Sequence, residues 1–566
     1  MLVTPHDYQA KGAAQIQHCA EGPFRGMILG DGMGLGKTLT GAMAMNIVRD
    51  QPGMCLVVCL AKDRVQWHNT ITNSWKEGYG SKSFILRDPR TTACQLLSLG
   101  VDVVICSYEY VENSVREAIR NHIKFVKVRE ARGNLERNLK RPCKTLFSEV
   151  YGLTGQLWKR LILDEAQTVS KPGQAKHDAI KKIPAEAIIC LTGTLAHNKW
   201  HDFWGYIDYF KGHPFESAEL FFHAFGNTEG QFADPESKQI RRLQRFMQPL
   251  IIARPRETNP LLTLVDRDSY KLCFELHPMC EGLVNEYISK YFRMLRNNKL
   301  NGADAWEGKG SRSVRLKCLS YATKAQLASL HPLLLLNIRV KTSTTDAEDG
   351  EDHQWSSLEE TGGDPAFTSR KQRLAWLELV QSASLRLAED SERTVHILAL
   401  YQWCRKHKPQ EKIVIFSQYL KFLDIIHQCL ERIGVEAIRY DGLVKVTDRP
   451  QVEKQFIKAD PSVPLLITAG AGGTGLNLQC ASIVIQTEVW WNHNTELQAI
   501  ARCDRQGQKK RVLYVRLFAE NSKIDAEYLQ VQSRKRKVNE ELMKPLIRCH
   551  NEGPEILELE DRLPLP

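Results

Sequence analysis

Short apolar runs rich in Val, Ile and Leu alternate with helical stretches in two separate blocks of the chain. Continuous apolar runs between helical patterns are typical of parallel strands that are buried on both faces. The pattern therefore predicts an α/β protein with two doubly wound parallel-sheet lobes, at 1–255 and 390–540. The runs of the first block are Met27–Gly30, Cys55–Leu60, Asp102–Ser107, Leu161–Leu163 and Ala187–Thr192. Those of the second are Lys412–Ser417, Val435–Tyr440, Leu465–Ala469, Ser482–Thr487 and Arg511–Leu517.

The segments outside these blocks have different compositions. Residues 256–389 are mostly helical in pattern and are expected to form a linker or insertion, within which the polar acidic tract 341–364 is expected to be a disordered loop. The insertion 111–158 carries ten Lys or Arg against five Glu. It is as consistent with a DNA-binding pair of helices as with a solvated pair. The tail 541–566 carries no recognisable signal.

Composition adds a mild preference for polyanions and excludes two classes of protein. The net charge of +11 favours partners such as nucleic acid, although many enzymes are this basic. No run of 18 apolar residues exists, so no membrane span is expected. The 15 Cys include no CxxC pair, which argues against a zinc finger, a RING module or a disulfide framework. A monomer with reduced thiols is the expectation.

A glycine-rich turn links the first apolar run to a helical stretch. Glycines let consecutive backbone N–H groups face a phosphate, and the following helix adds the positive end of its dipole. Lys37 supplies a charge for the β- and γ-phosphates, and Thr38 a hydroxyl for magnesium. A turn without nucleotide is the alternative, because Asp31 stands where the strict pattern has Gly. The nucleotide-binding prediction covers Asp31, Gly32, Met33, Gly34, Leu35, Gly36, Lys37 and Thr38.

Two acids follow the apolar run that ends at Leu163. Asp164 is placed to hold magnesium, and its neighbour Glu165 to orient or deprotonate a water. Paired acids at a strand end also cap helices, so this motif alone is ambiguous. Its position, 126 residues after Thr38, makes the two motifs together far more specific than either.

The second block contains a further glycine-rich turn, with Gly473 and Gly475, and a cluster of Arg and Gln. Arg502 and Arg505 lie three residues apart on an expected helix, hence on one face. Guanidinium groups stabilise the charge that builds on a γ-phosphoryl group during hydrolysis, and Gln498 could brace them. A solvated basic helix face is the alternative.

The order of these motifs resembles the Swi/Snf family of chromatin-remodelling ATPases in helicase superfamily two. The stretches that carry the resemblance are PHDYQAKG (5–12), DGMGLGKT (31–38), LVVCLAKDRVQW (56–67), DVVICSYE (102–109), DEAQ (164–167), LTGTLAHN (191–198), KIVIFSQY (412–419), YDG (440–442), GGTGLNL (472–478) and QAIARCDRQGQ (498–508).

The resemblance implies two tandem RecA-like lobes, an ATP- and magnesium-dependent hydrolase, and double-stranded DNA as partner. It implies that Gln9 reads adenine, and that Thr38 and Asp164 hold magnesium. It also implies that the catalytic groups are Lys37, Asp164, Glu165, Arg502 and Arg505, and that Ser107, Tyr108, Thr192 and Thr474 face the DNA backbone. Translocation along the duplex, in chromatin remodelling or DNA repair, follows as the expected activity, with nucleosomes or other DNA-bound proteins as further candidate partners.

Several positions depart from the family pattern. Gln167 replaces the usual His, Leu195 and His197 follow the TGT, and Glu488 replaces Asp before WWN (490–492). The WWN and DEAQ details are most similar to the DNA-damage-tolerance subgroup, whose RING finger is not visible here. RKRK (534–537) is compatible with nuclear localisation, with a DNA contact, or with a structural helix face.

Three other functions are alternatives. An RNA helicase of the same superfamily usually carries Ser-Ala-Thr where this chain has Thr192-Gly193-Thr194. A catalytically weak DNA-binding scaffold conflicts with the intact Lys37 and Glu165. A kinase or another phosphate-loop enzyme leaves the second block unexplained.

Overall fold

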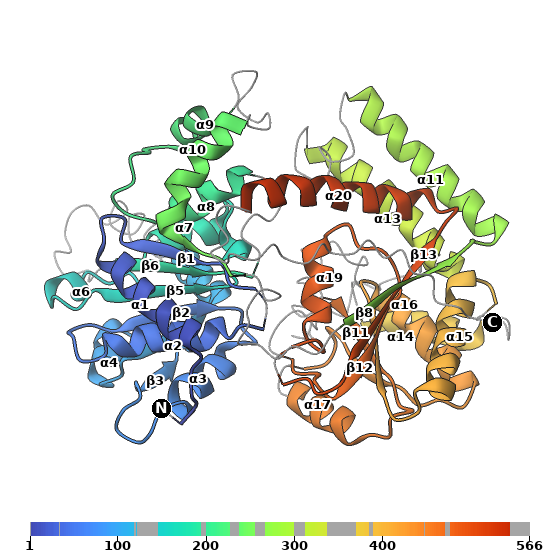
Figure 1. Ribbon diagram of the computed structural model, residues 1–566, viewed down its shortest axis with the longest axis horizontal. Helices are drawn as coiled ribbons and strands as arrows, with labels where there is room; N and C mark the ends of the chain where they lie inside the picture. Colours follow the sequence, from blue (N-terminus) through green and yellow to red (C-terminus); the bar gives the residue numbers. More distant parts are fainter. Residues whose placement is uncertain are drawn as a thin grey trace, which may run out of the picture. The chain divides into compact units, whose positions relative to one another are not determined.

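The computed structural model describes residues 2–32, 34–117, 120, 145–193, 200–226, 237–254, 267–298, 312–336, 370–383, 389–445, 448–469, 476–505 and 507–543. The chain divides into two compact units, whose main parts are Met1–Leu262 and Thr263–Arg536. Each unit is built around one parallel sheet (Figure 1).

The sheet of the first unit has seven strands in the order β3-β4-β2-β5-β6-β1-β7. Every neighbouring pair in it is parallel. Three neighbouring strands in the middle of this order, β5, β6 and β1, therefore end at the same edge. The strands are β1 (Gly26–Leu29), β2 (Cys55–Cys59), β3 (Ser83–Ile85), β4 (Val103–Ser107), β5 (Trp158–Asp164), β6 (Ala185–Leu191) and β7 (Ile251–Ile252).

Alternate residues of these strands enter two separate cores. Leu56 and Leu161 belong to the core on one face of the sheet, whereas Val57 and Ile162 belong to the core on the other. All four side chains are fully buried. Successive side chains of a strand point to opposite faces of the sheet. Because helices cover both faces, side chains on either face are buried, which accounts for the continuous apolar runs of these strands in the sequence.

Helices cover both faces of this sheet (Figure 1). α1 packs against α2, and α2 against α3. The helices are α1 (Asp7–Glu21), α2 (Lys37–Ile47), α3 (Arg64–Asn73), α4 (Ala93–Ser98), α6 (Val150–Leu153), α7 (Ala175–Lys181), α8 (Trp204–Ile207), α9 (Ala218–Phe225) and α10 (Ser237–Met247), with 3₁₀ turns η1 (Ala166–Val169), η2 (Trp200–Phe203) and η3 (Gln248–Leu250).

The sheet of the second unit has six strands in the order β10-β11-β9-β12-β13-β8, again all parallel. The strands are β8 (Arg267–Phe274), β9 (Lys412–Ser417), β10 (Ile438–Tyr440), β11 (Leu465–Thr468), β12 (Ala481–Gln486) and β13 (Val512–Ala519). The helices are α11 (Pro278–Asn297), α13 (Arg312–Leu330), α14 (Arg370–Ser382), α15 (Glu392–His407), α16 (Leu420–Arg432), α17 (Arg449–Lys458), α19 (His493–Ile500) and α20 (Lys523–Met543), with the 3₁₀ turn η4 (Pro332–Leu335).

The expectation that 256–389 forms a linker needs correction. β8 lies at the edge of the second sheet, paired with β13 over its whole length. Apolar residues of α11 and α13, such as Val284 and Ala325, belong to the same core as the β9 residue Ile413. The described parts of this segment are therefore an integral part of the second unit.

The fold class is confirmed, since both sheets are parallel and each is covered by helices. Strands β3, β7 and β8 were not expected. Each lies at the edge of its sheet or is only two or three residues long, where the apolar signal is weak. The acidic tract 341–364 and residues 544–566 lie outside the described residues, as do 118–119 and 121–144 of the basic insertion. No helix among the described residues is both long and apolar enough to cross a bilayer.

A buried ion pair joins distant parts of the second unit. The guanidinium of Arg393 on α15 is fully buried and donates to the Asp525 carboxylate at 2.8 Å. Its other N–H groups donate to the backbone oxygens of Ser329 at 3.1 Å and of Thr487 at 2.9 Å. A single side chain on α15 therefore satisfies groups on α13, on α20 and at the residue that follows β12.

We expect Arg393→Met to destabilise the protein by about 3–5 kcal/mol, because it leaves Asp525 buried without its charge partner. The measurement is urea unfolding followed by circular dichroism. Lys406→Met, at an exposed position of the same helix, is the control and should stay within about 0.5 kcal/mol of wild type. Equal stabilities for the two variants would contradict the role assigned to Arg393.

Candidate functional site

The loop after β1 adopts the conformation that its glycines permit. Gly34 and Gly36 have φ of 82° and 72°, the left-handed region that residues with a Cβ rarely adopt. Gly36 is the N-cap of α2, so the first N–H groups of that helix face the loop. A Cβ at Gly36 would also collide with the Gln9 amide. The loop therefore has the shape of a phosphate cradle at a helix N-terminus.

The ammonium of Lys37 is directed toward the loop backbone. It donates to the carbonyl oxygens of Asp31 at 3.0 Å and Gly32 at 3.3 Å. Burial raises the pKa of the Asp164 carboxyl, and Lys37 is close enough to oppose a small part of that rise. Lys37 thus lies in the same region as the acid, as the motif order predicts.

Helix α1 holds the loop from the other side. The Tyr8 hydroxyl and the Gln9 amide both donate to the carbonyl oxygen of Leu35, at 3.0 and 3.2 Å. The Gln9 side-chain oxygen accepts from the His6 N–H at 3.0 Å. Gln9 is only 3% exposed, and in this structure it braces the phosphate loop. Its contact with adenine stays a prediction.

Asp31, which stands where the strict phosphate-loop pattern has Gly, has a partner that the sequence pattern does not reveal. Its fully buried carboxylate accepts from Arg254, with a distance of 2.8 Å between Arg254 Nε and Asp31 Oδ1 and a second bond to Oδ2. Arg254 also lies over the Tyr8 ring, 5.0 Å from its centroid, and donates to the Tyr8 carbonyl oxygen. The residue in place of Gly therefore ties the loop to α1 and to the segment that follows β7. An acid in a loop that is expected to be buried predicts a cationic partner, although it does not indicate which residue supplies it.

Asp164 ends β5, and its side chain is partly buried. Trp67 Nε1 donates to Oδ2 at 2.7 Å, and the Glu165 N–H donates to Oδ1 at 3.1 Å. Burial raises the pKa of Asp164 from 3.8 to about 7, and the nearby Glu165 and Asp63 carboxyls add to the shift. This carboxyl has no cationic hydrogen-bond partner among the described residues, which suits the coordination of a divalent cation.

Magnesium is usually held in nucleotide sites by one or two carboxylates together with phosphate oxygens, rather than by a cluster of protein ligands. Consistent with this, no group of three or more His, Cys, Asp or Glu among the described residues forms a metal-binding cluster. The Asp164 carboxyl and the Thr38 hydroxyl, at the start of α2, fit that minimal set.

Glu165 has a backbone φ of 50°, one of two non-glycine residues with positive φ in the described chain. Such strain costs of the order of 1–3 kcal/mol and is concentrated at functional sites. Gln167 Nε2 donates to the Glu165 carboxylate at 2.7 Å, and Gln167 Oε1 accepts from the Thr192 hydroxyl at 2.7 Å. The amide thereby connects the end of β5 with the end of β6.

The expected second-unit residues are described in part. Helix α19 ends at Ile500, so Arg502 and Arg505 lie in the turns that follow it, and the expectation that they share a helix face is wrong. The Arg502 carbonyl oxygen accepts from the Leu478 N–H at 3.0 Å, which ties this segment to the region after the glycine-rich turn. Burial raises the pKa of Glu453, and the nearby Arg505 opposes that shift. Gln498 is partly buried on α19; Met33, Gly473, Thr474 and Gly475 lie outside the described residues.

Comparison with known proteins identifies the family. Residues 8–299 match the SNF2-related domain, and residues 394–507 match the helicase conserved C-terminal domain. The chain belongs to the SNF2-related family. The SNF2-related match covers the first unit from residue 8, with the phosphate loop and the Asp164–Glu165 pair, and continues into β8 and α11 of the second unit. The helicase C-terminal match runs from α15 through α19.

The SNF2-related chain is similar over most of its length to larger proteins. It is 23% identical over 527 residues to an ISWI chromatin-remodeling complex ATPase of Saccharomyces cerevisiae, covering 91% of this chain and 38% of the relative. It is 24% identical over 451 residues to a DNA repair protein of Arabidopsis thaliana, covering 67% of this chain and 34% of the relative. The chain thus spans little more than a third of the length of these relatives. Among solved structures it is 19% identical to the Sulfolobus solfataricus SWI2/SNF2 ATPase core in complex with dsDNA, with a TM-score of 0.37 and coverage of 97% and 100% of the two chains.

The expected DNA contacts of the first unit stay predictions, and their side chains are buried in this structure. Ser107, Tyr108 and Thr192 are only 4%, 1% and 0% exposed. The Tyr108 hydroxyl donates to the carbonyl oxygen of Asp164 at 2.6 Å, and the Ser107 hydroxyl accepts from the Tyr110 N–H at 3.2 Å. In this structure Tyr108 and Thr192, which follow β4 and β6, bond to the 164–167 segment, whereas Ser107, the last residue of β4, bonds to the turn that follows it.

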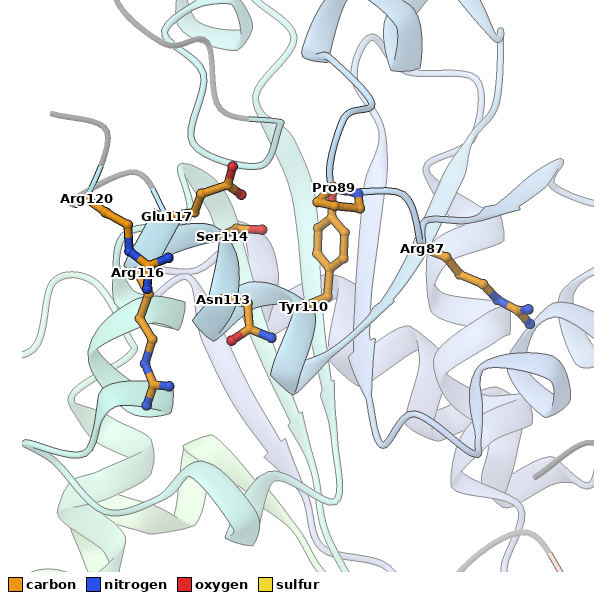
Figure 2. Close-up of a pocket in the computed structure, with 8 residues that line it drawn as sticks. All are labelled: Arg87, Pro89, Tyr110, Asn113, Ser114, Arg116, Glu117 and Arg120. Carbon is orange, nitrogen blue, oxygen red and sulfur yellow. The ribbon is translucent and has the colours of Figure 1, made fainter. Parts of the chain in front are cut away.

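A separate pocket of about 440 Å³ opens between the segment after β3 and the helix after β4 (Figure 2). None of its lining residues belongs to the phosphate loop or to 164–167. The Arg116 side chain at its wall is paired with Glu112. The lining residues are Arg87, Pro89, Tyr110, Asn113, Ser114, Arg116, Glu117 and Arg120.

We expect Asp31→Ala and Arg254→Ala each to cost about 3–5 kcal/mol of stability, because each leaves a buried charge unpaired. The double variant should cost less than the sum of the two, with a coupling free energy of roughly 0.5–3 kcal/mol. Chemical unfolding of all four proteins measures this cycle. The exposed pair Lys290–Glu286 is the control and should show no measurable coupling. Additive costs at Asp31 and Arg254 would refute the pairing.

The raised pKa of Asp164 predicts a pH-dependent stability. A carboxyl whose pKa is higher in the folded state stabilises the fold fully at pH values below its unfolded-state pKa of 3.8. This stabilisation is lost as the pH rises from there to the folded-state pKa of about 7. The stability of Asp164→Asn relative to wild type, measured without divalent cations, should therefore increase by roughly 2–4 kcal/mol between about pH 4 and pH 8. The control Asp50→Asn, at a side chain that is 88% exposed, should show no such trend. A pH-independent difference for Asp164→Asn would contradict the buried, uncompensated carboxyl.

Proposed function

We propose that this chain is an ATP-hydrolysing, DNA-stimulated motor that translocates along double-stranded DNA. One observation carries the proposal. A phosphate cradle after β1 and an acidic pair after β5 share one edge of a parallel sheet, separated by β6 alone. Neighbouring strands are about 4.8 Å apart, so the two strand ends lie roughly 10 Å from each other, a span suited to a bound triphosphate.

Each residue of the first unit then has a role in hydrolysis. The N–H groups around Gly34 and Gly36 bind phosphate oxygens, and Lys37 turns its ammonium from the loop carbonyls to the β- and γ-phosphates. Thr38 and Asp164 hold magnesium, which neutralises phosphate charge. Glu165 orients the attacking water and accepts its proton. The link from Glu165 through Gln167 to Thr192 supports a connection between hydrolysis and the end of β6.

The second unit supplies the remaining charges in this proposal. Arg502 and Arg505 stabilise the transferring phosphoryl group, a contribution of about 4–7 kcal/mol where such an arginine has been removed from other enzymes. Gln498 braces them. Thr474, beside Gly473 and Gly475, contacts the DNA backbone. Backbone contacts of this kind are independent of sequence and sensitive to salt.

The biological setting is also a proposal. The names of the relatives favour chromatin remodelling or DNA repair, with nucleosomes or other DNA-bound proteins as targets and the nucleus as location. Kinship to the DNA-damage-tolerance subgroup is supported by WWN and DEAQ, and by similarity to a protein named for DNA repair.

We expect Lys37→Ala and Glu165→Gln each to lower DNA-stimulated ATP turnover by more than about 100-fold, because they remove the phosphate cation and the water-orienting carboxylate. DNA binding should survive in both. The assay compares ATP hydrolysis without nucleic acid and with duplex DNA, single-stranded DNA, RNA and nucleosomes, and triplex displacement reports tracking. Lys76→Ala, at an exposed lysine of the same unit, is the matched control.

Unchanged DNA-stimulated turnover in either catalytic variant would refute the assigned site. Stimulation by RNA in place of duplex DNA would instead favour the RNA-directed helicase. A wild-type protein that binds DNA without any turnover would favour the scaffold.

A further inference from the structure

Helix α10 of the first unit has one wholly basic face. Its sequence, SKQIRRLQRFM, contains no acidic residue. The basic positions are i, i+3, i+4 and i+7, which lie on the same side of an α-helix. All four side chains on this face are exposed, namely Lys238, Arg241, Arg242 and Arg245.

The opposite face of α10 is firmly anchored. Leu243 and Met247 are fully buried in the core of the unit. The Phe246 ring makes contacts with the rings of Phe215 at 5.4 Å and Phe225 at 5.7 Å, the latter on α9. Figure 1 shows α9 and α10 side by side. The helix therefore presents its basic face from a rigid support, rather than from a loop.

Among the residues that the structure describes, no acidic side chain balances the charge of this face. Lys238–Arg242 and Arg241–Arg245 are like-charge pairs at i,i+4 spacing, and Lys238–Arg241 and Arg242–Arg245 at i,i+3 spacing, which destabilise a helix. The only hydrogen bond described for these side chains runs from Arg242 to the Ala224 carbonyl oxygen at 3.2 Å. No Asp or Glu among the residues that the structure describes is paired with any of them. An external polyanion would relieve this repulsion.

The spacing of the charges fits a nucleic-acid strand. Seven residues of α-helix span about 10 Å. One strand of a duplex carries a phosphate about every 3.4 Å of its axis, hence roughly three over that length. A basic face of this length matches the backbone better than a single bound anion.

We propose that the basic face of α10 is a second binding surface for the phosphate backbone of duplex DNA. It is distinct from the catalytic edge of the sheet, because Phe246, near the end of α10, contacts Phe24, which precedes β1, whereas the phosphate loop follows β1. This inference rests on the proposed function as a DNA motor, and adds a contact that sets DNA affinity without taking part in hydrolysis.

The test replaces Lys238, Arg241, Arg242 and Arg245 together by Gln and measures binding of a fluorescent blunt duplex between about 50 and 200 mM salt. The logarithm of the association constant K falls linearly with the logarithm of the salt concentration, and each lost phosphate contact makes this plot less steep by about 0.9. We expect the slope to fall by roughly 2–4 and the affinity to fall at least about tenfold at low salt. ATP turnover at saturating DNA should be unchanged.

Two control variants separate charge from folding. The triple variant Arg241→Lys, Arg242→Lys, Arg245→Lys keeps the charge and should keep the wild-type slope. Gln at Lys76, Lys82, Lys171 and Lys182 removes as many exposed charges elsewhere in the unit, and should lower the slope by less than one. Replacing the four basic residues of α10 by Gln relieves like-charge repulsion, so the melting temperature of the quadruple variant should not fall below that of wild type.

The double variant Arg241→Gln, Arg245→Gln is a milder test, for which the salt plot should become less steep by about one to two.

The outcomes are distinguishable. If wild type shows DNA-stimulated turnover and the quadruple variant retains its salt slope, this inference alone fails. If the variant loses affinity for polyglutamate but not for duplex DNA, the surface serves an acidic protein and the inference also fails. If wild type neither binds DNA nor responds to it, both proposals fail.

Discussion

Burial of both faces of the parallel strands is the constraint that organises this molecule. Apolar residues fill the two cores on either side of each sheet, and the candidate catalytic groups of the first unit lie at the ends of its strands. In the first unit β5, β6 and β1 are neighbours, and their carboxyl ends carry Asp164, Thr192 and the phosphate loop. The site is therefore a consequence of strand order more than of any single side chain.

The buried and partly buried acids described above differ in how their charge is compensated. Asp31, Asp424 and Asp525 each accept from an Arg, so their charges are compensated within the fold. Asp164 accepts only from neutral N–H groups, and its pKa is raised to about 7. Glu488 is fully buried and accepts from Ser417 and Trp490, and burial raises its pKa. Asp164 and Glu488 therefore both accept only from neutral groups among the described residues and both have a raised pKa. Of the two, Asp164 lies at the candidate catalytic position, which agrees with the tendency of functional sites to hold perturbed groups.

The sequence was sufficient for the central strands, because a long apolar run bounded by helical patterns is typical of a strand buried on both faces. The sequence did not predict β8, because its residues follow the alternating pattern of an edge strand and not a continuous apolar run. Its partner β13 also lies far along the chain. The sequence pattern also extended α19 beyond Ile500, since element ends are weakly specified by pattern. The phosphate loop and Asp164 were predictable from local motifs. Arg254 and Trp67 were not assigned a role, because their contacts join residues 223 and 97 positions apart.

Gln167 sets a limit on how protons can move near the strand ends. A histidine in its place would gain or lose a proton near neutral pH, whereas a carboxamide keeps a permanent donor end and a permanent acceptor end. Its NH₂ group faces Glu165 and its oxygen faces Thr192, so the bridge has a fixed direction. Protonation of Glu165 would weaken this bridge without reversing it. Glu165 is therefore the only titratable group of this bridge, and the Gln167 amide transmits its protonation state to Thr192 through the strength of one hydrogen-bonded chain.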